Sequence, residues 1–143
     1  MSLRARASRF FVGEKRAMMR DDSYLRRKRR IVKPRAFTTA ERQSLERFKA
    51  VLKSLVGDDL LSLRLFGSRA REEGADDSDL DVLVVLRHKD RALCRRIVEA
   101  ALDIDLAFET NLAPTIVSAE EYEQNRRYNT PFYSNVERES IPL

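Results

Sequence analysis

The sequence predicts an α/β (α+β) fold in which a small mixed β-sheet is flanked by helices. Two observations favour this fold. Segments whose apolar residues recur at helical spacing alternate with short apolar runs of the kind that form strands. The hydrophobic residues make up 43% of the chain, which is enough for a core. The length of 143 residues suggests one domain and is too short for a doubly wound sheet.

The first predicted helix covers residues 39–56. Thr38 and Glu41 have the spacing of a capping box, which satisfies free amides at a helix start, and Gly57 is a typical helix stop. Residues 60–66 alternate like a β-strand and contain no helix breaker, so we expect the first strand there. In the helix predicted at residues 39–56, the apolar residues at helical spacing are Leu45, Phe48, Leu52 and Leu55.

The second predicted strand covers residues 80–86. It is apolar on both faces, which is typical of a central position in a sheet. Between the two strands, Gly67 and Ser68 predict a turn, residues 69–73 a short helix, and residues 74–78 a loop. Ser68 is therefore expected at the start of the short helix.

A long helix and a third strand are predicted next. Apolar residues at helical spacing run from Asp90 to about Glu109, and Asn111 is expected to cap the C-terminus of this helix. Residues 112–118 read as the third strand, in which Pro114 indicates an edge position or an irregular start.

Two short helices complete the prediction. Ser118 and Glu121 form a second capping box, which opens the first of them. Thr130 is the expected N-cap of the other, with Pro131 at its first helical position.

The charge divides the chain into a basic N-terminal arm and an acidic domain. Residues 1–36 hold 13 Lys/Arg and 3 Asp/Glu, a net charge of +10, whereas residues 37–143 hold 15 and 20, a net charge of −5. A basic run of this kind either binds RNA or another polyanion, binds an acidic protein, or remains a solvated extension. The run peaks at Arg26, Arg27, Lys28, Arg29 and Arg30.

Cysteine content and hydropathy indicate a cytoplasmic protein. Cys94 is the only cysteine, so an internal disulfide is impossible and a reducing compartment fits. No run of about 18 apolar residues is present, so we expect no transmembrane helix. The N-terminus lacks the apolar region of a secretory signal.

Two carboxylates at the start of the second strand are the strongest functional signal. Asp79 and Asp81 would point to the same face of a strand, where their charges repel unless a cation or hydrogen-bond donors offset the repulsion. Carboxylate oxygens suit Mg²⁺ or Mn²⁺. Gly67 allows close approach of backbone to a ligand, and a helix start at Ser68 favours an anion. Each motif alone is commonly structural, but together they predict a nucleoside-triphosphate site.

The segment "GSRAREEGADDSDLDVLVV", residues 67–85, resembles the signature of the DNA-polymerase-beta-like nucleotidyltransferases. It is most similar to the small single-domain group that includes the minimal nucleotidyltransferase antitoxins, and the resemblance covers about residues 40–143. It implies a nucleotidyltransferase-like fold and transfer of a nucleoside monophosphate from a triphosphate to a protein or nucleic-acid acceptor. It also implies that Gly67, Ser68 and Arg69 bind the nucleotide, while Asp79 and Asp81 bind the divalent ions and are catalytic.

The chain departs from this family at a third carboxylate, which family members usually carry on the next core strand. The predicted strand 112–118 has no acid. If residues 103–108 formed that strand instead, Asp103 or Asp105 would complete the metal site. Helical periodicity, however, places both in the long helix, with Asp103 facing water and Asp105 at the helix border.

Three functions therefore stay open at the level of sequence. The first is a metal-dependent nucleotidyltransferase that uses a nucleoside triphosphate such as ATP. The second is a catalytically weak or inactive nucleotide-binding module that acts, like an antitoxin, on a partner protein or RNA; by family analogy the partner is a helical, toxin-like protein. The third is a nucleic-acid-binding protein that acts through its basic arm.

Overall fold

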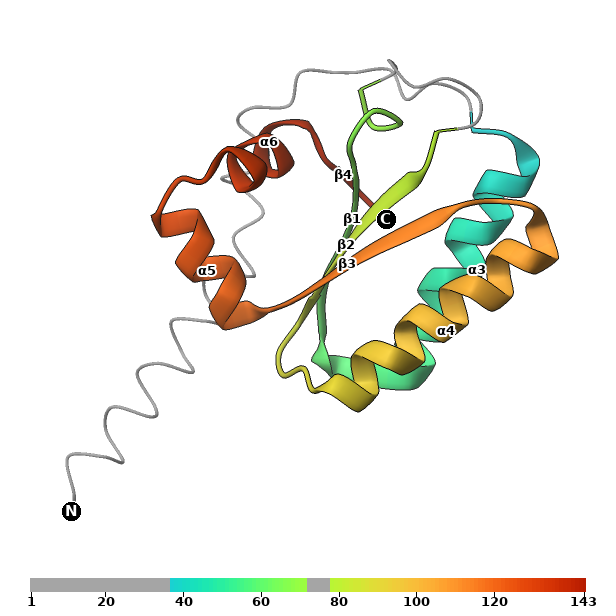
Figure 1. Cartoon of the computed structure of the whole chain (residues 1–143), viewed down its shortest axis with the longest axis horizontal. Helices are drawn as coiled ribbons and strands as arrows, with labels where there is room; N and C mark the ends of the chain where they lie inside the picture. The colour runs from blue at the N-terminus through green and yellow to red at the C-terminus, as the bar shows by residue number, and fades with distance from the viewer. Residues whose placement is uncertain (1–36, 72–77) are drawn as a thin grey trace.

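A computed structural model describes residues 37–71 and 78–143 of the chain (Figure 1). The predicted basic arm, residues 1–36, lies outside the described residues, as do most of the loop predicted at 74–78 and the end of the short helix predicted at 69–73. The division of the chain into an arm and a domain stays a prediction. In chain order the elements are α3 (Thr39–Val56), the 3-10 turn η1 (Gly57–Asp59), β1 (Leu60–Phe66), β2 (Leu80–Leu86), α4 (Arg91–Phe108), β3 (Leu112–Ser118), α5 (Ala119–Arg127), α6 (Pro131–Glu139) and β4 (Ile141–Pro142).

The sheet is mixed, as the sequence predicts, with strand order β3-β2-β1-β4. β1 is antiparallel to both β2 and β4, whereas β2 and β3 run parallel. β2 lies inside the sheet, in agreement with its apolar character on both faces, and β3 is an edge strand, in agreement with Pro114. Pro142 lies on β4 at the opposite edge, so both strand prolines of the described chain occupy edge strands, where a missing amide donor is tolerated.

Helices cover both faces of the sheet (Figure 1). Val82 and Val84 of β2 pack in the larger core with α3 and α4. Leu83 and Val85 point to the opposite face, where they form a smaller core with Val136 of α6. This division follows from the two-residue period of a strand. Asp81 shares the face of Leu83 and Val85, so its position within the strand already sets the side of the sheet to which the carboxylate points.

Local signals fix the ends of α3 as predicted. The Thr38 hydroxyl accepts a hydrogen bond from the Glu41 amide (3.1 Å), and the Glu41 carboxylate accepts one from the Thr38 amide (2.8 Å). Gly57 ends the helix with a φ of 52°, a conformation that favours glycine. The second capping box, Ser118 with Glu121, opens α5 in the same way.

Two predictions of local structure are wrong, and one short strand was missed. Residues 69–71 form a turn and not the first part of a helix. The C-cap of α4 is Glu109, in the left-handed conformation, and not Asn111. The strand β4 was not expected, because two residues carry no periodicity of their own.

Among the helices of the described chain, none is both long and apolar enough to cross a bilayer.

Candidate active site

The ends of two paired strands bring the Gly-Ser turn and the two acids together. β1 ends at Phe66, directly before Gly67, and Phe66 is the register partner of Asp81 on the antiparallel strand β2. Asp79 lies two residues before Asp81, just outside the strand, and is exposed, whereas Asp81 is partly buried. Antiparallel pairing thus places residues 14 apart in sequence, Gly67 and Asp81, side by side at one end of the sheet.

Gly67 and Asp81 are in closer contact than any other residue type at position 67 would allow. Gly67 has a φ of 77°, and a Cβ built on it would overlap the Oδ2 atom of Asp81 and lie only 3.1 Å from Cγ. The turn is closed by a hydrogen bond from the Arg71 amide to the Ser68 carbonyl (3.1 Å). The backbone of the Gly-Ser turn therefore lies directly against one of the two carboxylates.

Asp79 is contacted by Asn111, a residue predicted from the sequence to cap a helix. The Asn111 side-chain amide donates a hydrogen bond to Asp79 Oδ1. The Asn111 carbonyl also accepts a bond from the Leu80 amide (2.8 Å), which continues the pairing of β2 with β3. A signal for this contact exists in the sequence, because Asn111 precedes the third strand as Asp79 precedes the second, and the two strands are parallel neighbours.

The electrostatics of the acid pair suit a cation. Burial raises the pKa of Asp81, and the negative charge of Asp79 raises it further. A divalent cation between the two carboxylates would oppose both effects, because it favours the charged form of each. The carboxylate oxygens of Asp79 and Asp81 are therefore donors of the type that Mg²⁺ or Mn²⁺ binds. That these two residues bind a metal ion stays a prediction.

The structure places Asp103 and Asp105 on α4, so the alternative in which residues 103–108 form a strand is wrong. Asp103 is exposed. Asp105 Oδ1 accepts hydrogen bonds from the Leu112 amide (2.8 Å) and the Thr110 hydroxyl (3.1 Å), so it joins the end of α4 to the start of β3. Burial raises the pKa of Asp105, these hydrogen bonds lower it, and the charge of Asp79 raises it.

Asp105 is thus near Asp79, but its carboxylate already serves a structural contact. In the described part of the chain, no three His, Cys, Asp or Glu side chains are grouped as a metal site would require. β3, the neighbour of β2, contains no acidic residue.

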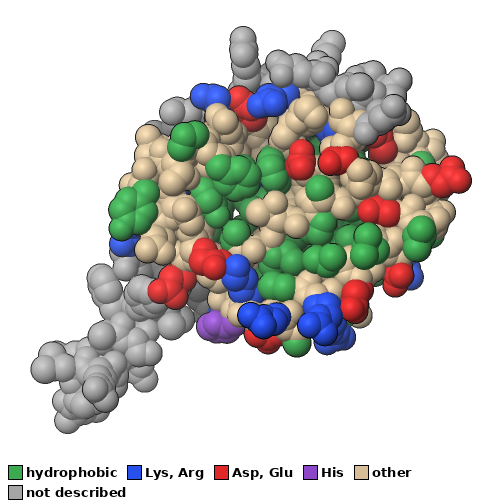
Figure 2. Space-filling view, in the orientation of Figure 1, with side chains coloured by type: hydrophobic (Ala, Val, Ile, Leu, Met, Phe, Trp, Pro, Cys, Tyr) green, Lys and Arg blue, Asp and Glu red, His purple; other side chains and the backbone are tan. Residues whose placement is uncertain are grey.

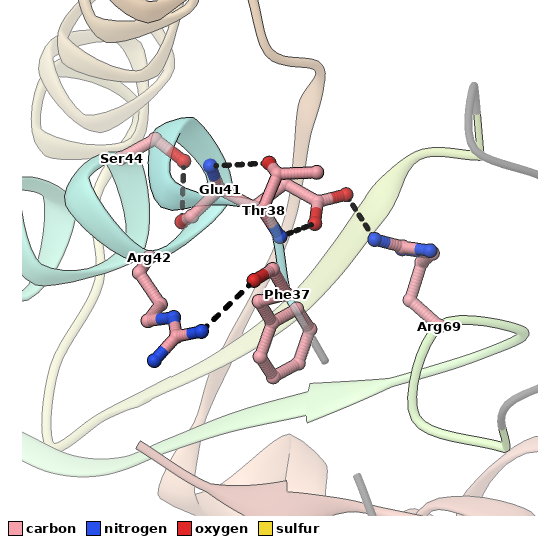
Figure 3. A network of polar contacts seen from close by, with 6 residues as sticks. All are labelled: Phe37, Thr38, Glu41, Arg42, Ser44 and Arg69. Atoms are coloured by element: carbon pink, nitrogen blue, oxygen red, sulfur yellow. Dashed lines mark hydrogen bonds and ion pairs between the residues drawn. The ribbon is translucent and has the colours of Figure 1, made fainter. Parts of the chain in front are cut away.

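Arg69 has a structural role that the sequence did not indicate (Figure 3). Its side chain is buried, its guanidinium forms an ion pair with the equally buried Glu41, and it lies 5.9 Å from the centre of the Phe37 ring. Because Glu41 also caps α3, this pair ties the Gly-Ser turn to the start of that helix. Contact of Arg69 with a nucleotide, as the resemblance implied, stays a prediction and would require this buried side chain to become accessible.

The chain is similar to known proteins of one kind. The sequence model of the family described as "Nucleotidyltransferase domain" matches residues 45–137, a range that includes the turn and both acids. A "putative protein adenylyltransferase" of Methanocaldococcus jannaschii is 32% identical over 76 residues, which are 51% of this chain and 52% of that protein. This chain thus matches about half the length of that relative. The solved structure of a "putative minimal nucleotidyltransferase" is 26% identical, with a TM-score of 0.46, and covers 76% of this chain and 100% of its own.

Proposed function

Because this chain belongs to the nucleotidyltransferase domain family, we propose that it transfers AMP from ATP to a protein acceptor, with Mg²⁺ or Mn²⁺ bound at Asp79 and Asp81. The observation that carries the proposal is the contact of the Gly67 backbone with the Asp81 carboxylate. This contact places a turn suited to binding phosphate next to a carboxylate suited to binding a cation. The choice of AMP and of a protein acceptor is supported by the name of the matched archaeal relative.

In this proposal the Gly-Ser turn binds the phosphates of ATP. The missing side chain at Gly67 lets a phosphate approach the backbone next to Asp81, and Ser68 adds a hydroxyl donor. A helix dipole does not contribute there, because the described residues after Ser68 form a turn. The phosphate would be bound by backbone amides and by the cation.

The two acids would hold the metal ion, and Asn111 would orient one of them. The hydrogen bond from Asn111 fixes the direction of the Asp79 carboxylate, while strand pairing fixes Asp81. When bound, Mg²⁺ or Mn²⁺ supplies positive charge that offsets the charge of the triphosphate. The main contribution of the protein is therefore positioning and charge stabilisation.

The transfer itself exchanges one phosphorus–oxygen bond for another. An acceptor hydroxyl oxygen forms a bond to the α-phosphorus of ATP, and the bond from that phosphorus to the bridging oxygen breaks. Pyrophosphate leaves with the bridging oxygen and its electron pair, and the hydroxyl proton passes to water. In the described chain the acid near this pair, Asp105, already accepts two hydrogen bonds and is not placed to take the proton, so we expect slow transfer.

Label transfer tests this function. The full chain is incubated with Mg²⁺, a cell extract as the source of acceptors, and ATP labelled on either the α- or the γ-phosphate. We expect the α-label, and not the γ-label, in protease-sensitive material. Asp79→Asn and Asp81→Asn should each reduce transfer by about 100-fold or more. Asp103→Asn, the same change at an exposed acid of α4, should leave transfer near the wild-type level.

The outcomes separate the possibilities. Equal transfer by the wild type and both site variants would refute the proposal. Nuclease-sensitive label would move the acceptor to nucleic acid, and a loss in Asp103→Asn would place a working acid on α4.

A second candidate, a nucleotide-binding module that acts on a partner without transfer, is favoured by one observation. In the described chain, no third His, Cys, Asp or Glu side chain groups with Asp79 and Asp81 as a metal site would require. Calorimetry with ATP, with and without Mg²⁺, distinguishes the two functions when combined with label transfer. Mg²⁺-dependent ATP binding without any label transfer would support the binding module.

A further inference from the structure

The solvent side of α4 carries apolar side chains that the fold leaves uncovered. Val98, Leu102 and Leu106 are 42%, 57% and 83% exposed. They are spaced four residues apart, so they lie on one face of the helix. The opposite face of α4 already supplies Ile97, Ala101 and Ile104 to the core. The exposed residues therefore form a second apolar face, which we term the α4 stripe.

Opposite charges flank the α4 stripe. Arg91 and Arg95 precede it, Glu109 follows it, and all three are exposed. At 3.6 residues per turn, the two arginines and the stripe fall within an arc of about 80°, and Glu109 caps the helix one turn beyond Leu106. Figure 2 shows blue side chains near the lower end of α4 and green ones along it, with red ones among and beyond them. Within residues 37–71 and 78–143, Arg95 and Glu109 form no ion pair.

We propose that the α4 stripe pairs with the α4 stripe of a second copy of this chain, in antiparallel orientation about a two-fold axis at Leu102. An isologous contact requires a surface that complements itself. Rotation about Leu102 places Val98 opposite Leu106, because each is four residues from the axis. The same rotation brings Arg95 to the C-terminal end of the partner helix, which Glu109 caps.

Polarity selects this partner and this orientation. A parallel pair of α4 helices would bring basic ends together and acidic ends together, which is unfavourable. The antiparallel pair forms two Arg95–Glu109 contacts around an apolar centre. Electrostatic complementarity of this kind fixes register more than it adds affinity.

The small area of the contact indicates a weak, reversible association. α4 is about 27 Å long, so one helix pair buries less than the roughly 1,600 Å² of a standard interface. We therefore infer a reversible dimer with a dissociation constant on the order of micromolar. The inference does not depend on the proposed transfer, because its measured quantity is mass.

Sedimentation equilibrium of the full chain over about 1–500 μM tests the dimer, because this range spans a micromolar dissociation constant. We expect the weight-average mass to rise from one chain to two over this range. Leu102→Asp, which places two carboxylates on the axis, should weaken dimerisation by at least about tenfold, since like charges would meet there. Circular dichroism verifies that the variant remains folded. A wild-type mass of one chain at every concentration would overturn the proposal and leave the stripe to another partner.

Charge reversal tests the register. Arg95→Glu alone and Glu109→Arg alone should each weaken the dimer, because like charges then meet at both symmetric contacts. An equimolar mixture of the two variants should restore dimerisation, since each Glu at position 95 then faces an Arg at position 109. Arg96→Glu, the same change at an exposed neighbour outside the arc, should leave the dimer unchanged. A mixture no better than the separate variants would refute the antiparallel register.

Discussion

At the scale of single residues, Gly67 is the position where the turn backbone meets the carboxylate of Asp81. We predict that Gly67→Ala destabilises the fold and abolishes transfer. The added Cβ would overlap the Asp81 carboxylate, and a φ of 77° is itself strained for alanine. Urea denaturation measures the free energy of unfolding, and label transfer measures activity.

Gly57→Ala is the matched control. Gly57 also has a positive φ, of 52°, but nothing lies within 4 Å of a Cβ built there. This variant should show only the cost of backbone strain, about 1–3 kcal/mol. Gly67→Ala should lose more than that and move Asp81. If the two variants lost equal stability and kept equal activity, the proposed contact between turn and carboxylate would be wrong.

Asp81 should make stability depend on pH. Its pKa is raised in the folded protein by burial and by Asp79, so the folded state binds more protons than the unfolded state at intermediate pH. The stability contribution of the protonated form is therefore present at low pH, below about 4, and lost as the pH rises through the raised pKa.

Asp81→Asn should remove the loss of stability that the wild type shows as the pH rises. Without divalent ions, we expect the variant to melt at a higher temperature than the wild type at pH 7 and to lose this advantage below about pH 4. Mg²⁺ should raise the melting temperature of the wild type more than that of the variant, because a ligand of the folded state stabilises it. A variant that is less stable than the wild type at neutral pH would contradict a raised pKa of Asp81 as the source of the pH dependence.

The parts of the site that sequence patterns missed are contacts between distant residues. Gly67, Ser68, Asp79 and Asp81 stand out because each signal lies within one turn or one strand. The partners of Arg69 and Asp79 are 28 and 32 residues away in sequence, respectively. Local periodicity does not report the pairing of Arg69 with Glu41, and Asn111 is interpreted as a helix cap as long as only its neighbours in sequence are considered.

At the scale of elements, the bounds of α3, β1, β2 and β3 agree with prediction because their signals are local. Capping boxes, a glycine stop and apolar periodicity all act within a few residues. β4 escaped prediction because its two residues become a strand only by pairing with the free edge of β1. Helix or strand type is thus set locally for long segments and by neighbours for short ones.

The link between α3 and the Gly-Ser turn depends on the buried Glu41–Arg69 pair. We predict that Glu41→Gln costs about 3 kcal/mol of unfolding free energy, because it leaves the Arg69 charge buried without its partner. Glutamine can still complete the capping box, so the loss reports the ion pair. Urea denaturation measures the difference.

Two further variants test the origin of this loss. Glu46→Gln, the same change at an exposed position of α3, should alter stability by less than about 0.5 kcal/mol. Glu41→Gln combined with Arg69→Met should recover part of the stability, because both charges are then absent. No recovery in the double variant would argue against an unpaired buried charge as the cause.

At the scale of the whole molecule, the last three residues close one edge of the sheet. Ile141 pairs with Leu65, and the Leu143 amide donates to the Leu63 carbonyl (3.0 Å). Both side chains also pack against the larger core. We predict that deletion of residues 141–143 costs about 2–4 kcal/mol, since two partly buried side chains are lost, and exposes the edge of β1 to association.

Thermal melting and light scattering measure these two effects. Pro142→Ala, which changes an exposed side chain between the two apolar residues, should leave both near the wild-type values. Full stability of the truncated chain would show that β4 does not protect the edge of β1.

Local sequence patterns were sufficient to predict the α/β class, the order and approximate bounds of the long elements, and the positions of the Gly-Ser turn and the acid pair. These features depend on short-range periodicity, caps and turn residues. The contact of Gly67 with Asp81, the burial of Arg69 against Glu41 and the exposure of an apolar stripe on α4 become visible only in the folded chain. Such contacts form only when strand pairing and helix packing bring separate segments together. A local sequence pattern carries no information about which distant segments will meet.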